Sequence, residues 1–231
     1  MFLREIARYF QLYKTEGDGL CAQQVMICGK LGKTLIRLNC TIVTNGCVLK
    51  KMSLSPVKRK ILENMLLNDK PARAAQIAKD SGNEFPTAMM HLLDLTRKGY
   101  TASPNKGQYV ITEKGKKALG IPETTKENAK ALLANTPGEK AFHFYTAMEK
   151  PLNIYACGLQ DFLDKIQKVE AESLEFHVCR GDFESWFTCL GDEELAKKMA
   201  LLKEKKLCGE ELRQKLCSIV ENRCKALSAI T

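Results

Sequence analysis

The hydrophobic residues of 53–120 change their spacing partway along, from a helical period to an alternating one. Up to about residue 98, apolar side chains recur at i, i+4 spacing, and the breaks between them carry Pro, Gly, Asp and Asn, which favour turns. Beyond it, two short alternating runs flank the turn-forming tetrad at 104–107. This pattern predicts helices at 56–68, 72–79 and 84–98, strands at 100–103 and 108–112, and a helix at 113–119.

The start and end signals of these helices support the assignment. Ser55 followed by Pro56 is typical of a helix start, Gly82 suits a left-handed turn, and Thr112 is a good N-cap. For the third helix the spacing predicts an inner side made of Phe85, Met89, Leu92, Leu93 and Thr96.

Three helices followed by a β-hairpin and one more helix is the element order of a winged helix-turn-helix. The segments AQIAK at 75–79, LLDLTRKGY at 92–100 and YVITEKG at 109–115 resemble the archaeal and bacterial winged-helix transcriptional regulators. The resemblance implies that 52–120 form a domain that binds duplex DNA.

Residues 2–13 could form a short basic amphipathic helix, whereas 20–49 carry no clear period, and we treat 1–51 as a poorly defined N-terminal extension. Because Met52 stands directly before the better-defined domain, we hypothesise that translation starts there and that 1–51 are not translated. The spacing of Cys21, Cys28, Cys40 and Cys47 lacks the close ligand pair of a structural zinc site, so we expect no metal.

The remaining chain predicts a linker at 121–140, with a helix near 126–134, and a small, mainly helical α+β domain at 141–231. Its strands are expected at 141–146 and 173–178, and its helices at 159–169, 182–190, 193–202 and 209–227. The last helix would bury Leu212, Leu216, Ile219, Val220 and Leu227. The segments LEFH at 174–177, RGDFESW at 180–186 and GEELR at 209–213 resemble a family of uncharacterised domains of archaea and some bacteria, which implies no activity. The fold class is therefore α+β.

Composition narrows the class of protein. The net charge is +9, of which 1–51 carry +5, 52–120 carry +6 and 121–231 carry −2, so the cationic surface belongs to the first half. No apolar run is long enough to span a bilayer, and we expect a cytoplasmic protein. The cysteines of the second half lie in apolar-periodic segments and are expected to be buried thiols.

A winged helix usually reads bases with the start of its third helix, while the wing contacts the backbone. We expect base or groove contacts from Asn83, Thr87, Met90 and His91. Phosphate contacts are expected from Lys58, Arg59, Lys60, Arg97, Lys98 and Lys106. Glu84 and Asp94 share the reading helix and would repel phosphate, which keeps a protein-binding winged helix open as an alternative.

One polar cluster of the second half resembles a ligand or partner site: His177, Arg180, Asp182, Glu184 and Trp186. There Asp182 is also a good N-cap, Trp186 a good core anchor, and Arg180 a salt-bridge partner. His143 and His177 would meet if their predicted strands paired, but a metal site would lack further ligands. The sequence contains no catalytic signature, so we expect neither a catalytic residue nor a cofactor.

We therefore expect a DNA-binding transcriptional regulator that acts as a homodimer, because one winged helix covers only a half-site. The C-terminal domain would dimerise, sense a small-molecule effector or contact another protein. Two alternatives remain open at this point: a protein-interaction module that uses the winged helix, and an enzyme or ligand-binding protein that uses the 177–186 region.

Overall fold

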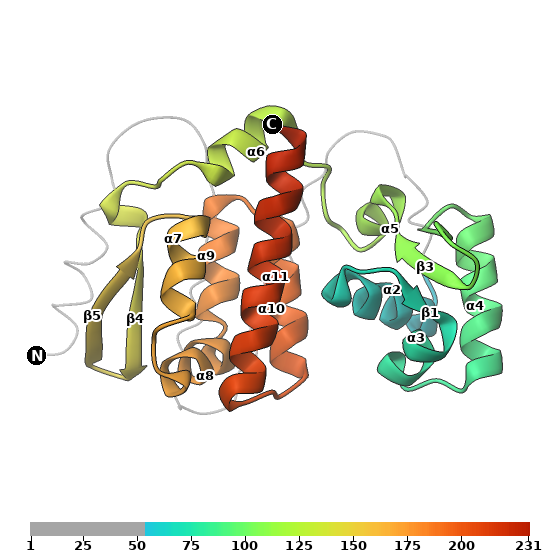
Figure 1. Ribbon diagram of the computed structural model, residues 1–231, viewed down its shortest axis with the longest axis horizontal. Helices are drawn as coiled ribbons and strands as arrows, with labels where there is room; N and C mark the ends of the chain where they lie inside the picture. Colours follow the sequence, from blue (N-terminus) through green and yellow to red (C-terminus); the bar gives the residue numbers. More distant parts are fainter. Residues whose placement is uncertain (1–53) are drawn as a thin grey trace, which may run out of the picture. The chain divides into compact units, whose positions relative to one another are not determined.

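The computed structural model describes residues 54–231, drawn in colour in Figure 1. The predictions for 1–53, namely the undefined extension, the absence of zinc and the start at Met52, lie outside these residues.

The first half of the described chain contains four helices and a small sheet. The elements are α2 (Pro56–Asn68), β1 (Ala72–Arg73), α3 (Ala74–Ser81), α4 (Phe85–Arg97), β2 (Thr101–Ala102), β3 (Gln108–Ile111) and α5 (Glu113–Ala118). The sheet has the order β1-β3-β2, and both pairs are antiparallel. All the predicted helices and both predicted strands are present, whereas β1 was not predicted because its residues were assigned to the helix at 72–79.

Local signals account for where these helices begin and end. Pro56 lies in the first turn of α2, and Gly82 adopts a left-handed backbone (φ 66°) that ends α3. The Thr112 hydroxyl accepts a hydrogen bond from the Gly115 amide at the start of α5. The backbone of each boundary residue thus follows from chemistry within a few positions of it.

The predicted inner side of α4 is partly wrong. The helix buries Ala88, Leu92 and Leu95, whereas Phe85 and Leu93 are exposed. A helix rotates by about 100° per residue, so a core stripe through 88, 92 and 95 turns residue 93 away from the core. Hydrophobicity alone did not indicate which of two adjacent leucines faces inward.

In the second half, a β-hairpin packs against one side of a group of helices (Figure 1). Its elements are α6 (Lys126–Leu133), a 3-10 turn η2 (Gly138–Lys140), β4 (Phe142–Ala147), β5 (Lys150–Ala156), α7 (Leu159–Ile166), α8 (Ala171–Arg180), α9 (Asp182–Leu190), α10 (Glu193–Glu204) and α11 (Gly209–Ile230). β4 and β5 pair antiparallel; α8 contacts β4, and α7 contacts β5. The predicted stripe of the last helix is buried in α11. The architecture is α+β, as expected.

The second predicted strand is wrong, because 173–178 belong to α8. Leu174, Phe176 and Val178 alternate with polar residues and imitate a strand, whereas the helix buries Ser173, Leu174, His177 and Val178. Ser173 and His177 are polar but occupy core positions, so the hydrophobic residues alone do not show the helical period. The strand that pairs with β4 is β5, in which Leu152, Ile154 and Ala156 are less exposed than their neighbours.

The expectation of buried cysteines is correct only in part. Cys224 is buried, Cys157 and Cys217 are half-buried, and Cys179, Cys189 and Cys208 are exposed. No helix between residues 54 and 231 is long and apolar enough to cross a membrane.

Candidate functional site

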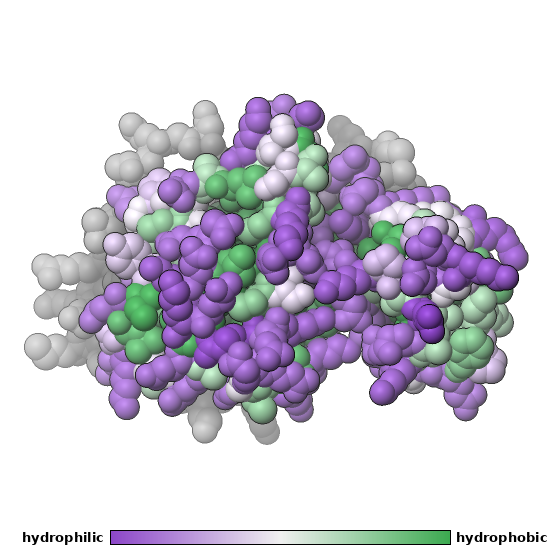
Figure 2. Space-filling view, in the orientation of Figure 1, coloured by the Kyte–Doolittle hydropathy of each residue, from purple (hydrophilic) through white to green (hydrophobic). Residues whose placement is uncertain are grey.

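Helix α4 presents an apolar face to solvent. Phe85 is 52% exposed, Met90 is 59% exposed and Leu93 is 49% exposed. These are three of the five large hydrophobic side chains that are exposed within 54–231. Figure 2 shows hydrophobic colour on the surface over α4, at the right edge of the view. We call Phe85, Met90 and Leu93 the α4 face.

A groove of about 740 Å³ lies along this face. Its apolar lining is Phe85, Pro86, Met89, Met90 and Leu93. Its polar lining is Lys58, His91, Asp94, Arg97 and Lys98. The structure thus gathers five of the predicted DNA-contacting residues around one groove, but half of the residues that line this groove are apolar.

Asp94 neutralises two of the cations that were predicted to bind phosphate. Its carboxylate accepts a hydrogen bond from Lys58 Nζ at 2.5 Å and forms an ion pair with Lys98 Nζ at 3.0 Å. These two ammonium groups hold the pKa of Asp94 at about 2, so the carboxylate stays charged at neutral pH. A phosphate would have to compete with Asp94 for both lysines.

Among the predicted DNA-contacting residues that Asp94 does not hold, one side chain is bound within the protein and several are exposed. The Asn83 amide donates to the Ser81 hydroxyl at 2.9 Å and thereby serves the turn before α4. Thr87, Arg59, Lys60, Arg97 and Lys106 are exposed, and none of these four cations forms an ion pair with another described residue.

Glu84 is the N-cap residue of α4, but its side chain makes no capping hydrogen bond. Its carboxylate is exposed at the helix N-terminus, where the helix dipole favours a negative charge. Glu84 forms no ion pair within 54–231.

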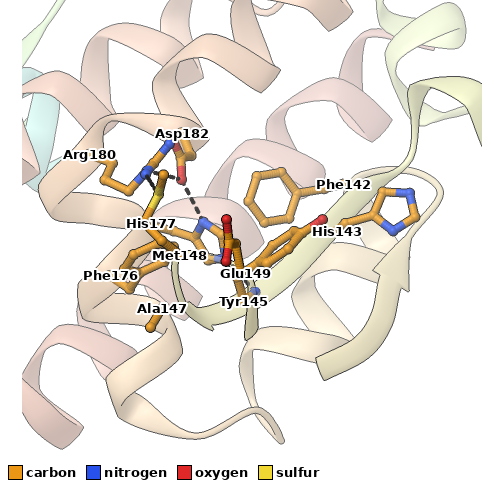
Figure 3. A pocket seen from close by; sticks show the side chains of 10 residues that line it. All are labelled: Phe142, His143, Tyr145, Ala147, Met148, Glu149, Phe176, His177, Arg180 and Asp182. Carbon is orange, nitrogen blue, oxygen red and sulfur yellow. Dashed lines mark hydrogen bonds and ion pairs between the residues drawn. The ribbon is translucent and has the colours of Figure 1, made fainter. Parts of the chain in front are cut away.

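The second candidate site is a pocket of about 390 Å³ beside β4, α8 and the start of α9 (Figure 3). His177 of α8 lines it and is almost completely buried. The Tyr145 amide donates to His177 Nε2 at 2.8 Å, and His177 Nδ1 lies 2.8 Å from Asp182 Oδ2. Since a backbone amide can only donate, Nε2 carries the lone pair and Nδ1 donates its proton to Asp182.

This arrangement indicates a structural role for His177. Burial lowers the pKa of the imidazole and outweighs Asp182, which would raise it. Both ring nitrogens are occupied by partners within the protein, so neither is available as a base for a ligand. His177 ties together β4, α8 and α9.

Of the predicted cluster, the structure brings His177, Arg180 and Asp182 together, whereas Trp186 faces the core. Arg180 pairs with Asp182 (Nε to Oδ2 3.2 Å), as predicted, and its guanidinium lies over the Phe176 ring. Trp186 is buried, as expected of a core anchor, and donates to the Lys140 carbonyl at 2.8 Å. Asp182 is the first residue of α9 and Gly181 is its N-cap, so the predicted N-cap is off by one residue.

The two histidines do not face each other. His143 lies on β4, is exposed, and packs beside Tyr155, and Figure 3 shows its ring pointing away from His177. Their predicted meeting on paired strands fails because His177 is on a helix. Among residues 54–231, no three His, Cys, Asp or Glu side chains cluster in a way that could hold a metal ion.

A buried ion-pair network was not predicted. Arg223 donates to Asp192 and Glu194, both at 2.9 Å, and Lys198 pairs with Glu194 at 2.8 Å. Burial raises the pKa of Glu194, but Lys198, Arg223 and Lys116 outweigh it and hold the pKa at about 2. The i, i+4 spacing of Glu194 and Lys198 was the only local signal of this network.

A comparison with known protein families finds a match in the second half of the chain. Residues 121–221 match the model of DUF5752, a family of unknown function. The match confirms the resemblance to an uncharacterised family, and it includes the segment that was predicted as a linker. No curated protein and no solved structure matches the chain.

Proposed function

We propose that residues 54–121 form a winged helix-turn-helix whose third helix, α4, docks another protein. The observation that carries this proposal is the α4 face, where Phe85, Met90 and Leu93 are about half exposed. The order of elements, the β1-β3-β2 sheet and the hairpin around Lys106 support the winged-helix assignment.

In a DNA-binding winged helix, this helix enters the major groove, where side chains must hydrogen-bond base edges or meet phosphates. Phe85, Met90 and Leu93 can do neither, and only the thymine methyl group would give them an apolar contact. Asp94 additionally holds Lys58 and Lys98. The chemistry of the helix therefore favours an apolar partner over a polyanion.

The free energy of burying these three side chains also favours a protein partner. Burial of a large apolar side chain contributes about 1.5–3 kcal/mol when it is complete, and all three side chains retain about half of that surface. Exposed apolar patches with a charged rim are typical of protein interaction sites. Arg97, Lys98 and Glu84 supply the charged ends of this patch.

A regulator that binds duplex DNA is the second candidate. Arg59, Arg97 and Lys106 favour it, because they are exposed and form no ion pair within the described part of the chain. For the C-terminal domain, a role in dimerisation, effector sensing or partner contact stays a prediction.

Photocrosslinking tests the docking proposal. A benzophenone side chain replaces Met90 in the full chain, expressed in the cells of its origin, and the same group replaces exposed Lys79 of α3 as the matched control. We expect a defined protein adduct from position 90 and not from position 79. Absence of a protein adduct at position 90 overturns the docking proposal.

A mobility shift on fragmented genomic DNA at two salt concentrations tests the second candidate. Phosphate binding weakens steeply with salt through counterion release. A salt-dependent shift that Arg97→Glu and Lys106→Glu abolish, together with no adduct at position 90, would establish DNA binding in place of docking.

A further inference from the structure

We propose that the partner of the α4 face is a second copy of this chain, whose α4 packs antiparallel to the first across a two-fold axis. This inference rests on the proposed docking function and names its occupant. In such a pair, each surface patch must be complementary to itself when one copy is reversed.

The charges at the ends of α4 meet this requirement. Glu84 precedes the helix and Arg97 is its last residue, and neither side chain has an ion-pair partner within 54–231. Antiparallel packing places Glu84 of each copy beside Arg97 of the partner subunit, twice in one dimer. Parallel packing would bring like charges together.

The apolar residues of the α4 face lie on both sides of the midpoint between these two charged ends. Met90 lies at the middle of the segment from Glu84 to Arg97, with Phe85 towards one end and Leu93 towards the other. A two-fold axis near Met90 therefore sets each methionine against its counterpart and the Phe85 end of one helix against the Leu93 end of the other. Because the facing helix runs in the opposite direction, the contact between the Phe85 end and the Leu93 end forms twice in one dimer.

The shape of the face fits the same packing. A self-complementary interface needs both a protrusion and a hollow on one patch, because each copy must supply both. Met90 is 59% exposed and lines the groove of about 740 Å³, so one patch supplies both an exposed side chain and a hollow. Two helices pack by placing the ridges of one into the grooves of the other at about 8–10 Å between axes.

The helix dipoles add to the preference for antiparallel packing, and the area of the helix limits how stable the dimer can be. Antiparallel helices bring the positive end of one dipole near the negative end of the other. A helix of 13 residues offers less surface than a standard stable interface of about 800 Å² per partner. We therefore expect a concentration-dependent dimer and not a permanent one.

Sedimentation equilibrium of the purified full chain across a range of concentrations tests the proposal. Met90→Glu puts two carboxylates at the two-fold axis, and we expect dimerisation at least about tenfold weaker. Ala131→Glu is the matched control, because Ala131 is exposed on α6, outside both candidate sites. It is expected to dimerise as the unmodified chain does, and circular dichroism checks that both variants fold.

Charge reversal tests the antiparallel orientation. Glu84→Lys and Arg97→Glu each create two like-charge contacts in the dimer and are expected to weaken it. The double variant, with both changes in every chain, restores opposite charges at both ends and is expected to recover dimerisation.

Three results would overturn the inference: a chain that stays monomeric, a dimer that Met90→Glu leaves intact, or a double variant no better than the single ones. Its failure is distinguishable from that of the docking function. A monomeric chain whose residue 90 crosslinks to a different protein retains docking and excludes the second copy. The absence of any protein adduct at position 90 removes both.

Discussion

The Lys198 ammonium of α10 lies 2.7 Å from the carboxylate of Asp69, the residue that ends α2, although the two are 129 positions apart in the chain. Lys198 is almost completely buried and also contacts Glu194. Removing one partner of a buried ion pair costs more than the pair contributes, because the remaining charge is left in a poorly solvated place. This pair therefore joins the first half of the described chain to its second half.

Lys198→Met is expected to lower the free energy of unfolding by about 3 kcal/mol, since it leaves Asp69 and Glu194 with one cation fewer. Lys225→Met is the matched control: it breaks an i, i+4 pair with Glu221 that is exposed, and such pairs contribute about 0.5 kcal/mol or less. Urea denaturation measures both. Equal effects of the two substitutions would contradict the structural role of the Lys198–Asp69 contact.

Stability should fall in acid because of Glu194. Its pKa is about 2 in the folded protein against 4.5 for an ordinary glutamate, so the unfolded chain binds the proton first as the pH drops. The contribution is present above about pH 4.5 and is lost as the pH falls towards 2. The shift corresponds to at most about 3 kcal/mol.

Glu194→Gln is expected to remove most of this pH dependence, as measured by urea denaturation at pH 7, 4.5 and 3. Exposed Glu221→Gln serves as the control and should leave most of it in place. If both variants keep the acid sensitivity of the unmodified chain, Glu194 is not its source.

His177→Phe is expected to lower the free energy of unfolding by about 2–4 kcal/mol. The ring volume is kept, but the Tyr145 amide loses its acceptor and half-buried Asp182 loses the donor from His177. His143→Phe changes an exposed histidine on β4 in the same way, and we expect an effect within about 0.5 kcal/mol. A small effect of His177→Phe on thermal or urea unfolding would refute the structural role assigned to the imidazole.

Gly115→Ala is expected to destabilise the first half by about 1–3 kcal/mol. A Cβ at this position would overlap with the Tyr100 carbonyl oxygen and lie 2.8 Å from Ile111 Cγ1, so α5 could not keep its distance from the hairpin. Gly138→Ala is the control, because a Cβ there meets nothing within 4 Å. Thermal unfolding compares the two, and a tolerated Gly115→Ala would show that α5 can move outward at little cost.

The two candidate sites, the α4 groove and the pocket beside His177, were predictable from the sequence to different degrees. The groove gathers Met90, His91, Arg97, Lys98 and Lys58, which the sequence had grouped as candidate contacts on this helix and its neighbour. That the middle of this face is apolar did not follow from the sequence, because Phe85 and Leu93 were assigned to the core. In the second half, the partners of His177 could not be predicted once α8 had been interpreted as a strand.

The sequence by itself determined where the chain turns. Pro56, Gly82 and Thr112 act on backbone atoms within a few residues, so their chemistry can be interpreted without knowing the rest of the fold. Only the tertiary structure decided which side of α4 is buried and which charge pairs with Lys198. Those choices depend on surfaces that are distant in the chain, and Asp69 reaches Lys198 only because α2 and α10 pack together.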